Sequence, residues 1–116
     1  MKTISAMLAV VALLAVVSAC RAGGGDAATV RQKIKAGALV VDVRTPAEFA
    51  AGAYAGATNI PLDQVEKRLT DFGDRRRAIV VYCRSGNRSG QAKVILEKNG
   101  FSDVTNGGGL KDMPPR

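Results

Sequence analysis

Apolar and polar residues along the chain fall into short blocks that alternate between strand-like and helix-like patterns. Residues 38–43 and 78–82 are nearly continuous apolar runs rich in β-branched side chains, and 57–60 is a shorter strand-like segment that stops at Pro61. Continuous apolar runs are typical of parallel strands that are covered on both faces. We therefore predict strands in these three segments and a last short strand at 103–105.

Helix signals separate these strands. Residues 45–48, Thr-Pro-Ala-Glu, form a capping box with proline at the first helical position. Asp26 is a candidate N-cap, and Gly37 and Gly100 are candidate helix stops. The predicted helices are 27–36, 46–51, 63–71 and 89–99.

The alternation of strands and helices predicts an α/β fold of three layers. We expect a small parallel sheet of about four to five strands with helices on both faces. In such sheets ligands bind at the carboxyl ends of the strands. Functional residues are therefore expected directly after the predicted strands.

Cys83 stands at such a strand end. A loop of Gly, Ser, Asn and Arg follows it, and a helix pattern begins after the loop. A thiolate in this place can accept backbone N–H hydrogen bonds and lies at the positive end of a helix dipole. Arg84 and Arg88 add positive field, and such surroundings lower a thiol pKa below its free value of ~8.5. The arrangement indicates a sulfur nucleophile that handles anions.

The residues after Cys83 are the candidate substrate-binding set. Backbone N–H groups of 84–88 are expected to form an anion-binding nest, and glycine allows the close approach that this needs. The arginines would attract an anionic donor, with Arg88 also bracing the loop, and the serines would donate hydrogen bonds or cap the helix. The set is Arg84, Ser85, Gly86, Asn87, Arg88 and Ser89.

Two further groups lie near the predicted strand ends. Asp42 and Arg44 are expected to order a loop, by a hydrogen bond or by an ion pair with Glu48, and Tyr82 is expected to pack. Residues 107–109, Gly-Gly-Gly, predict a turn near the active site. Neither a helix pattern nor a Lys-Ser/Thr pair follows them, so a phosphate loop is not indicated.

The chain begins with a secretory signal pattern. A basic start is followed by the apolar stretch 4–17, which is shorter than the ~20 residues of a membrane-spanning helix. We predict a signal peptide at 1–19, a flexible tether at 20–25 and a domain at 26–116.

The end of the signal, Val17-Ser18-Ala19-Cys20, resembles the lipobox of bacterial lipoproteins. That resemblance implies a lipid on Cys20 and a membrane-anchored protein of the periplasm or cell envelope. The alternative is ordinary cleavage after Ala19 or Ala22, which would give a soluble exported protein. If Cys20 is lipidated or cleaved away, Cys83 is left as the free thiol, without a partner for an intramolecular disulfide.

Charge and composition narrow the chemistry. The formal net charge is +7, but most basic residues are scattered and export would remove the protein from nucleic acid, so no nucleic-acid partner is expected. The chain has 0 histidines. This excludes His-based acid–base catalysis, Cys-His proteases and most zinc sites. No metal or cofactor is expected.

Several segments together resemble the rhodanese-like single-domain sulfurtransferases, and most closely exported members of the phage shock protein E type. The matching segments are Asp-Val-Arg-Thr-Pro-Ala-Glu-Phe at 42–49, Gly-Ala-Thr-Asn-Ile-Pro-Leu at 56–62, Tyr-Cys-Arg-Ser-Gly-Asn-Arg-Ser at 82–89, and Gly-Phe and Gly-Gly at 100–101 and 108–109. Ala53, Asn106 and Met113 depart from the residues that the family usually has there.

The resemblance implies a covalent double displacement through Cys83. The thiolate would take the outer sulfur of a small anionic donor, thiosulfate or a persulfide, and hold it as a persulfide. An acceptor, cyanide in the assay or a thiol in the cell, would then remove that sulfur. The expected enzyme is a thiosulfate sulfurtransferase.

Two other function classes stay open at this point. Cysteine phosphatases and arsenate reductases also place a cysteine before a helix, but with the spacing Cys-x5-Arg, whereas Cys83 and Arg88 are spaced Cys-x4-Arg. The other class is a non-catalytic envelope stress or binding protein on the same scaffold, with a redox carrier as a lesser variant.

Overall fold

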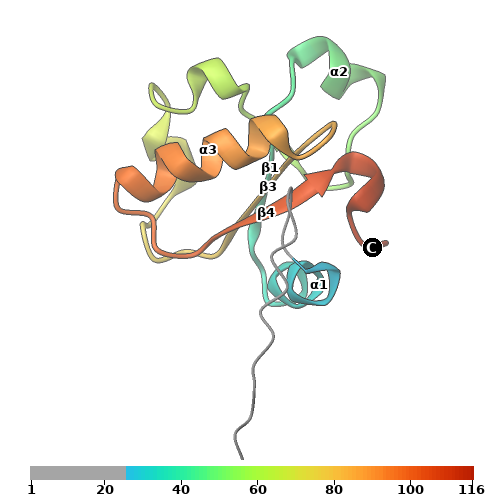
Figure 1. Ribbon diagram of the computed structural model, residues 1–116, viewed down its shortest axis with the longest axis horizontal. Helices are drawn as coiled ribbons and strands as arrows, with labels where there is room; N and C mark the ends of the chain where they lie inside the picture. Colours follow the sequence, from blue (N-terminus) through green and yellow to red (C-terminus); the bar gives the residue numbers. More distant parts are fainter. Residues whose placement is uncertain (1–25) are drawn as a thin grey trace, which may run out of the picture.

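A computed structural model describes residues 26–116 (Figure 1). They contain a 4-stranded parallel sheet in the order β2-β1-β3-β4. The strands are β1 (Leu39–Asp42), β2 (Thr58–Asn59), β3 (Ile79–Cys83) and β4 (Val104–Gly109). The predicted α/β class with a small parallel sheet is confirmed. The predicted signal peptide, the lipidation site Cys20 and the tether at 20–25 lie outside the described residues.

Helices cover both faces of this sheet. They are α1 (Ala27–Lys35), α2 (Pro46–Ala51) and α3 (Asn87–Lys98), with 3-10 turns η1 (Leu62–Gln64), η2 (Leu69–Phe72) and η3 (Leu110–Asp112). In Figure 1, α1 lies on one side of the strands and α3 on the other. Within residues 26–116 no helix is long and apolar enough to cross a membrane.

Strand β3 is buried on both of its faces, which explains why its sequence is apolar throughout. Val81 and Cys83 belong to the hydrophobic cluster under α3, which also contains Leu96 and Phe72. Val80 and Tyr82 belong to a second cluster, on the α1 side with Val30. Because successive side chains of a strand point to opposite faces, a strand between two cores must be apolar at every position.

The capping box at Thr45 forms as predicted. The Thr45 Oγ1 accepts the Glu48 N–H at 3.2 Å, and the Glu48 carboxylate accepts the Thr45 N–H at 3.2 Å. Asp26 occupies the N-cap position of α1, but its side chain makes no capping hydrogen bond. Local rules therefore place both helix starts, and α2 is fixed next to the end of β1.

The predicted helix at 63–71 is wrong. The segment consists of the turns η1 and η2, and the backbone leaves the helical region between them at Arg68, with φ −122° and ψ 36°. Val65 and Phe72 on either side of this break are both fully buried. The chain bends so that both side chains reach the core under α3.

The predicted turn at 107–109 is also wrong, because the three glycines end strand β4. A β-carbon at Gly107 would lie 2.7 Å from Met113 Sδ, and one at Gly109 would overlap the backbone carbonyl of Arg84. Gly108 has φ +83°, where the pairing register of β3 and β4 shifts. The glycines thus allow neighbouring chain segments to approach β4 closely.

Candidate active site

Cys83 is the last residue of β3 and is 1% exposed. Its Sγ accepts the Gly86 N–H at 2.9 Å and lies 3.3 Å from the Ser89 Oγ. Gly86 has φ 98°, in the left-handed region that favours glycine. This conformation turns the loop back, so that its N–H groups point at the sulfur.

The loop favours the ionised form of the thiol. Burial by itself would raise the pKa of Cys83. Hydrogen bonds from the Ser89 hydroxyl and from the backbone N–H groups of Ser89, Ser85 and Gly86 act in the opposite direction. They outweigh burial, and the pKa of Cys83 lies below its ordinary value.

Helix α3 begins at Asn87, directly after the loop, two residues earlier than predicted. Its N-cap is Gly86, and no side chain caps this end. The serines therefore do not cap the helix; Ser89 lies inside it, fully buried, and faces the sulfur. A 12-residue helix directs the positive end of its dipole toward Cys83, which stabilises negative charge there.

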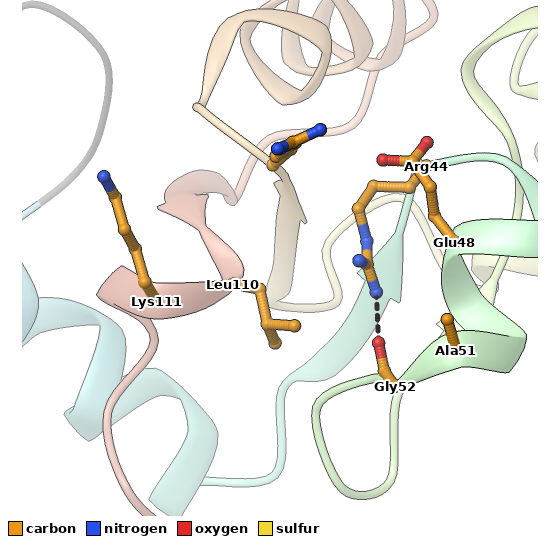
Figure 2. Close-up of a pocket in the computed structure, with 7 residues that line it drawn as sticks. Arg44, Glu48, Ala51, Gly52, Leu110 and Lys111 are labelled. Atoms are coloured by element: carbon orange, nitrogen blue, oxygen red, sulfur yellow. Dashed lines mark hydrogen bonds between the residues drawn. The ribbon is translucent and has the colours of Figure 1, made fainter.

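Asp42 organises the neighbouring strand end. Its carboxylate accepts the Arg44 backbone N–H at 2.8 Å and the Arg44 guanidinium at 2.7 to 3.0 Å, and it accepts the Tyr82 hydroxyl at 2.8 Å. Burial raises the pKa of Tyr82 to about 12, so this hydroxyl stays protonated. Arg44 also donates to the Gly52 carbonyl at 2.8 Å (Figure 2). The pair therefore ties β1 to the end of α2.

Glu48 pairs with Arg88 and not with Arg44. Two guanidinium nitrogens of Arg88 donate to the carboxylate of Glu48 at 2.8 and 3.0 Å. Hydrogen bonds from Arg88 are the main reason that the pKa of Glu48 is lowered to about 2. This ion pair links the first turn of α3 to α2 and braces the Cys83 loop, and it balances the charge of Arg88.

A cleft of about 740 Å³ opens beside the loop. Figure 2 shows Leu110 and Lys111 of η3 on one side of it and Arg44, Ala51 and Gly52 on the other. Arg84, the residue after Cys83, also lines the cleft. Arg84 and Lys111 are exposed and have no ion-pair partner within residues 26–116. The cleft is therefore positively charged.

Comparison with known proteins identifies this arrangement. Residues 26–112 match the rhodanese-like domain. The chain belongs to the rhodanese-like family. It is 45% identical over 74 residues to the thiosulfate sulfurtransferase PspE of Escherichia coli, a match that spans 63% of this chain and 71% of PspE. The predicted enzyme class, a sulfurtransferase of the rhodanese type, is confirmed by such relatives.

Other rhodaneses agree in sequence and fold. The thiosulfate sulfurtransferase GlpE of Pseudomonas putida is 40% identical over 70 residues, which are 60% of this chain and 63% of GlpE. A solved structure described as a rhodanese with anions from E. coli has a TM-score of 0.62 and 43% identity, covering 66% of this chain and 93% of that one. The human single-domain sulfurtransferase TSTD1 has a TM-score of 0.65 and 27% identity, over 74% and 88% of the two chains.

Within this rhodanese, the structure divides the predicted loop residues into three groups. Gly86 and Ser89 contact the sulfur directly, and Ser85 contributes its backbone N–H. Arg88 braces the loop through Glu48. The side chains of Arg84 and Asn87 are exposed, and Asn87 Oδ1 accepts only the Gln91 amide, at 3.5 Å.

Sequence reasoning missed two residues of the rhodanese site. Lys111 lines the cleft from η3, and Asn106 of β4 accepts the Ser89 hydroxyl at 2.7 Å. The signal for Asn106 was its place near the carboxyl end of a parallel strand, where sites form. Within residues 26–116, no cluster of side chains could hold a metal ion.

Substitution of Gly109 tests how closely β4 packs against the loop that follows Cys83. In the substitution Gly109→Ala, the new β-carbon would overlap the Arg84 carbonyl, so the backbone next to Cys83 must move. We expect a loss of ~1–3 kcal/mol of stability and a fall of about tenfold or more in sulfur transfer, because small displacements at a reacting atom cost rate. Urea denaturation and a thiocyanate assay measure the two effects.

Gly90→Ala is the matched control for this substitution. Gly90 lies in α3, and a β-carbon there would meet only Asn106 Nδ2, at an ordinary 3.4 Å. Alanine in a helix should raise stability by ~0.5–1 kcal/mol. Equal effects of the two substitutions on stability would contradict the role given to Gly109.

Proposed function

We propose that this protein is a thiosulfate sulfurtransferase in which Cys83 carries the transferred sulfur as a persulfide. The observation that supports this most is the loop from Arg84 to Ser89. This loop surrounds the buried thiol of Cys83 with backbone donors that lower the pKa of the thiol, and an open cationic cleft lies next to the loop. A second thiol for an intramolecular disulfide is absent from residues 26–116.

In the first half-reaction, the Cys83 thiolate attacks the outer sulfur of thiosulfate. A bond forms between Sγ and that sulfur, and the sulfur–sulfur bond of thiosulfate breaks. Its electron pair leaves with sulfite, and Cys83 is left with a terminal sulfur that carries a negative charge. The N–H groups of the loop and the dipole of α3 stabilise this charge.

In the second half-reaction, an acceptor attacks the terminal sulfur of the persulfide. Cyanide gives thiocyanate, and a thiolate gives a new persulfide; in both cases the Sγ–S bond breaks and Cys83 leaves as a thiolate. Neither half-reaction transfers a proton, which is compatible with a chain of 0 histidines. The two steps predict ping-pong kinetics.

The cleft is proposed to attract the anionic donor through Arg84 and Lys111. In the double variant Arg84→Gln/Lys111→Gln we expect KM for thiosulfate to rise about threefold to tenfold at low salt, with a smaller change in kcat. The difference should shrink as salt increases, because these charges are exposed. Initial rates of thiocyanate formation at two ionic strengths measure both effects.

Lys98→Gln is the control for charge alone. Lys98 ends α3, so it lies at the opposite end of this helix from Cys83. It should leave KM unchanged. A similar rise in KM from Lys98→Gln would mean that net charge, and not the cleft, attracts the donor.

The experiment that tests the proposed activity mixes purified protein with thiosulfate and cyanide and measures thiocyanate and sulfite. One of each is expected per turnover. The geometry disfavours the phosphatase alternative, because Glu48 holds the guanidinium of Arg88. Hydrolysis of an aryl phosphate without any sulfur transfer would favour the phosphatase over the sulfurtransferase. Inactivity in both assays would favour a binding protein.

We also propose that the protein is exported and anchored in the cell envelope by a lipid on Cys20. The support is the apolar stretch at 4–17 and the lipobox-like residues 17–20. Cells fed a labelled fatty acid should label the protein, and Cys20→Ser should remove the label. Normal labelling of the Cys20→Ser chain would contradict the lipid site.

A further inference from the structure

The side chain of Asn106 in β4 makes three hydrogen bonds, two of them to the Cys83 loop and one within β4. Its Nδ2 donates to the Gly86 carbonyl at 3.0 Å, and its Oδ1 accepts the Gly108 N–H at 2.9 Å and the Ser89 hydroxyl at 2.7 Å. Ser89 in turn lies 3.3 Å from the Cys83 sulfur. The order of contacts is thus Cys83, Ser89, Asn106.

The orientation of the Asn106 amide is fixed by backbone groups. A backbone N–H can only donate and a carbonyl can only accept, so the oxygen of the amide must face Gly108 and the nitrogen must face Gly86. Rotation of the amide would break both bonds. Asn106 therefore always presents an acceptor to Ser89.

Ser89 has one hydroxyl proton for two neighbours. In the neutral thiol, Ser89 donates this proton to Asn106 Oδ1 and can accept the thiol proton of Cys83. When Cys83 ionises, the thiolate has no proton to donate and needs donors itself. The Ser89 hydroxyl can donate to the thiolate only by giving up its bond to Asn106, because it has a single proton.

We propose that Asn106 is a positioning residue that competes with the Cys83 thiolate for the Ser89 hydroxyl proton. Asn106 thereby disfavours the free thiolate relative to states in which Sγ has a second covalent bond, the thiol and the persulfide. In the persulfide, the negative charge is on the outer sulfur, and Ser89 can keep its bond to Asn106. The relevance to sulfur transfer rests on the proposed function, whereas the proton competition does not.

The competition predicts that removal of the Asn106 side chain lowers the pKa of Cys83, whereas simple loss of structure in the loop would raise it. In Asn106→Leu, Ser89 is free to donate to the sulfur, so the pKa of Cys83 should fall. At a pH well below the midpoint, the thiolate fraction should rise about tenfold, the effect of one net hydrogen bond. Loosening of the Gly86 turn would withdraw an N–H from the sulfur and shift the pKa upward instead.

The other charges around the loop stay in place in this variant. They come from the Cys83 loop, η3, α2, α3 and the end of β1, and none forms a hydrogen bond with the Asn106 side chain. The groups are Arg84, Lys111, Asp112 and the pairs Arg88–Glu48 and Arg44–Asp42.

The experiment measures the rate of alkylation of Cys83 by iodoacetamide against pH, because only the thiolate reacts. Quantification of the tryptic peptide 78–84 by mass spectrometry reports Cys83 without interference from Cys20. The chains are the native protein, Asn106→Leu, Ser89→Ala and the double variant. Thermal unfolding verifies that each is folded, with Asn106→Ala as the substitute if Asn106→Leu is not.

The expected result is a lower midpoint in Asn106→Leu, a higher one in Ser89→Ala, and no effect of Asn106→Leu when Ser89 is already alanine. An unchanged or higher midpoint in Asn106→Leu overturns the proposal. So does an equal decrease in the Ser89→Ala background, since the effect would then not pass through Ser89. If the native protein forms no thiocyanate although the four midpoints are as predicted, that result would instead count against the proposed function.

Discussion

Replacement of Cys83 by serine should reduce sulfur transfer about a thousandfold or more, to the rate of the buffer. A serine hydroxyl cannot form a persulfide, and it is scarcely ionised at neutral pH. The fold should persist, because the serine oxygen can still accept the Gly86 N–H that now reaches the sulfur. The measurement is thiocyanate formation from thiosulfate and cyanide, together with thermal unfolding.

Cys20→Ser is the matched control, since the chain has 2 cysteines and this is the same change at the other one. It should retain full transfer in the assay. Turnover by Cys83→Ser above the buffer rate would assign the chemistry to another group. Loss of activity in both variants would show that the assay responds to something other than the nucleophile.

Of the substitutions proposed for this protein, Asp42→Ala should lower the free energy of unfolding most, by about 3–5 kcal/mol. Asp42 is 0% exposed, and its partner Arg44 is only 7% exposed. Removal of the carboxylate leaves a buried guanidinium without its counter-charge and also removes the acceptor of the Tyr82 hydroxyl. Urea denaturation of the native and variant chains measures the difference in free energy of unfolding.

Asp71→Ala is the control for the loss of an ion pair as such. Asp71 pairs with Arg68 at 2.8 Å, but the two side chains are 47% and 37% exposed. Exposed pairs contribute under about 1 kcal/mol. Equal losses from the two substitutions would mean that burial of the Asp42 pair does not matter.

Most of the fold was predictable because its determinants are local. The capping box at Thr45 and the apolar run of β3 each lie within a few residues of the chain, and both predicted their elements. The position of Cys83 between a strand and a helix was predicted for the same reason. The segment 63–71 was not, because the burial of Val65 and Phe72 under α3 depends on distant residues.

The interactions of the site that were missed are long-range. Glu48 is near Arg44 in sequence, yet it pairs with Arg88, 40 residues away. The local sequence of the β4 glycines is typical of a turn. Glycine is needed there because the Arg84 carbonyl and Met113 approach the strand closely. Asn106 accepts the hydroxyl of Ser89, 17 residues before it, and Ser89 in turn contacts Cys83. Such contacts become visible only when the sheet brings the strand ends together.

The central claim is that Cys83 carries the sulfur, and the mass of the peptide 78–84 tests it most directly. After brief treatment of the native protein with thiosulfate and alkylation of free groups, this peptide should gain one sulfur atom, with one sulfite released. Addition of cyanide should remove the sulfur. If the peptide keeps its original mass while thiocyanate is still formed, or if the sulfur is found on another residue, the claim is contradicted.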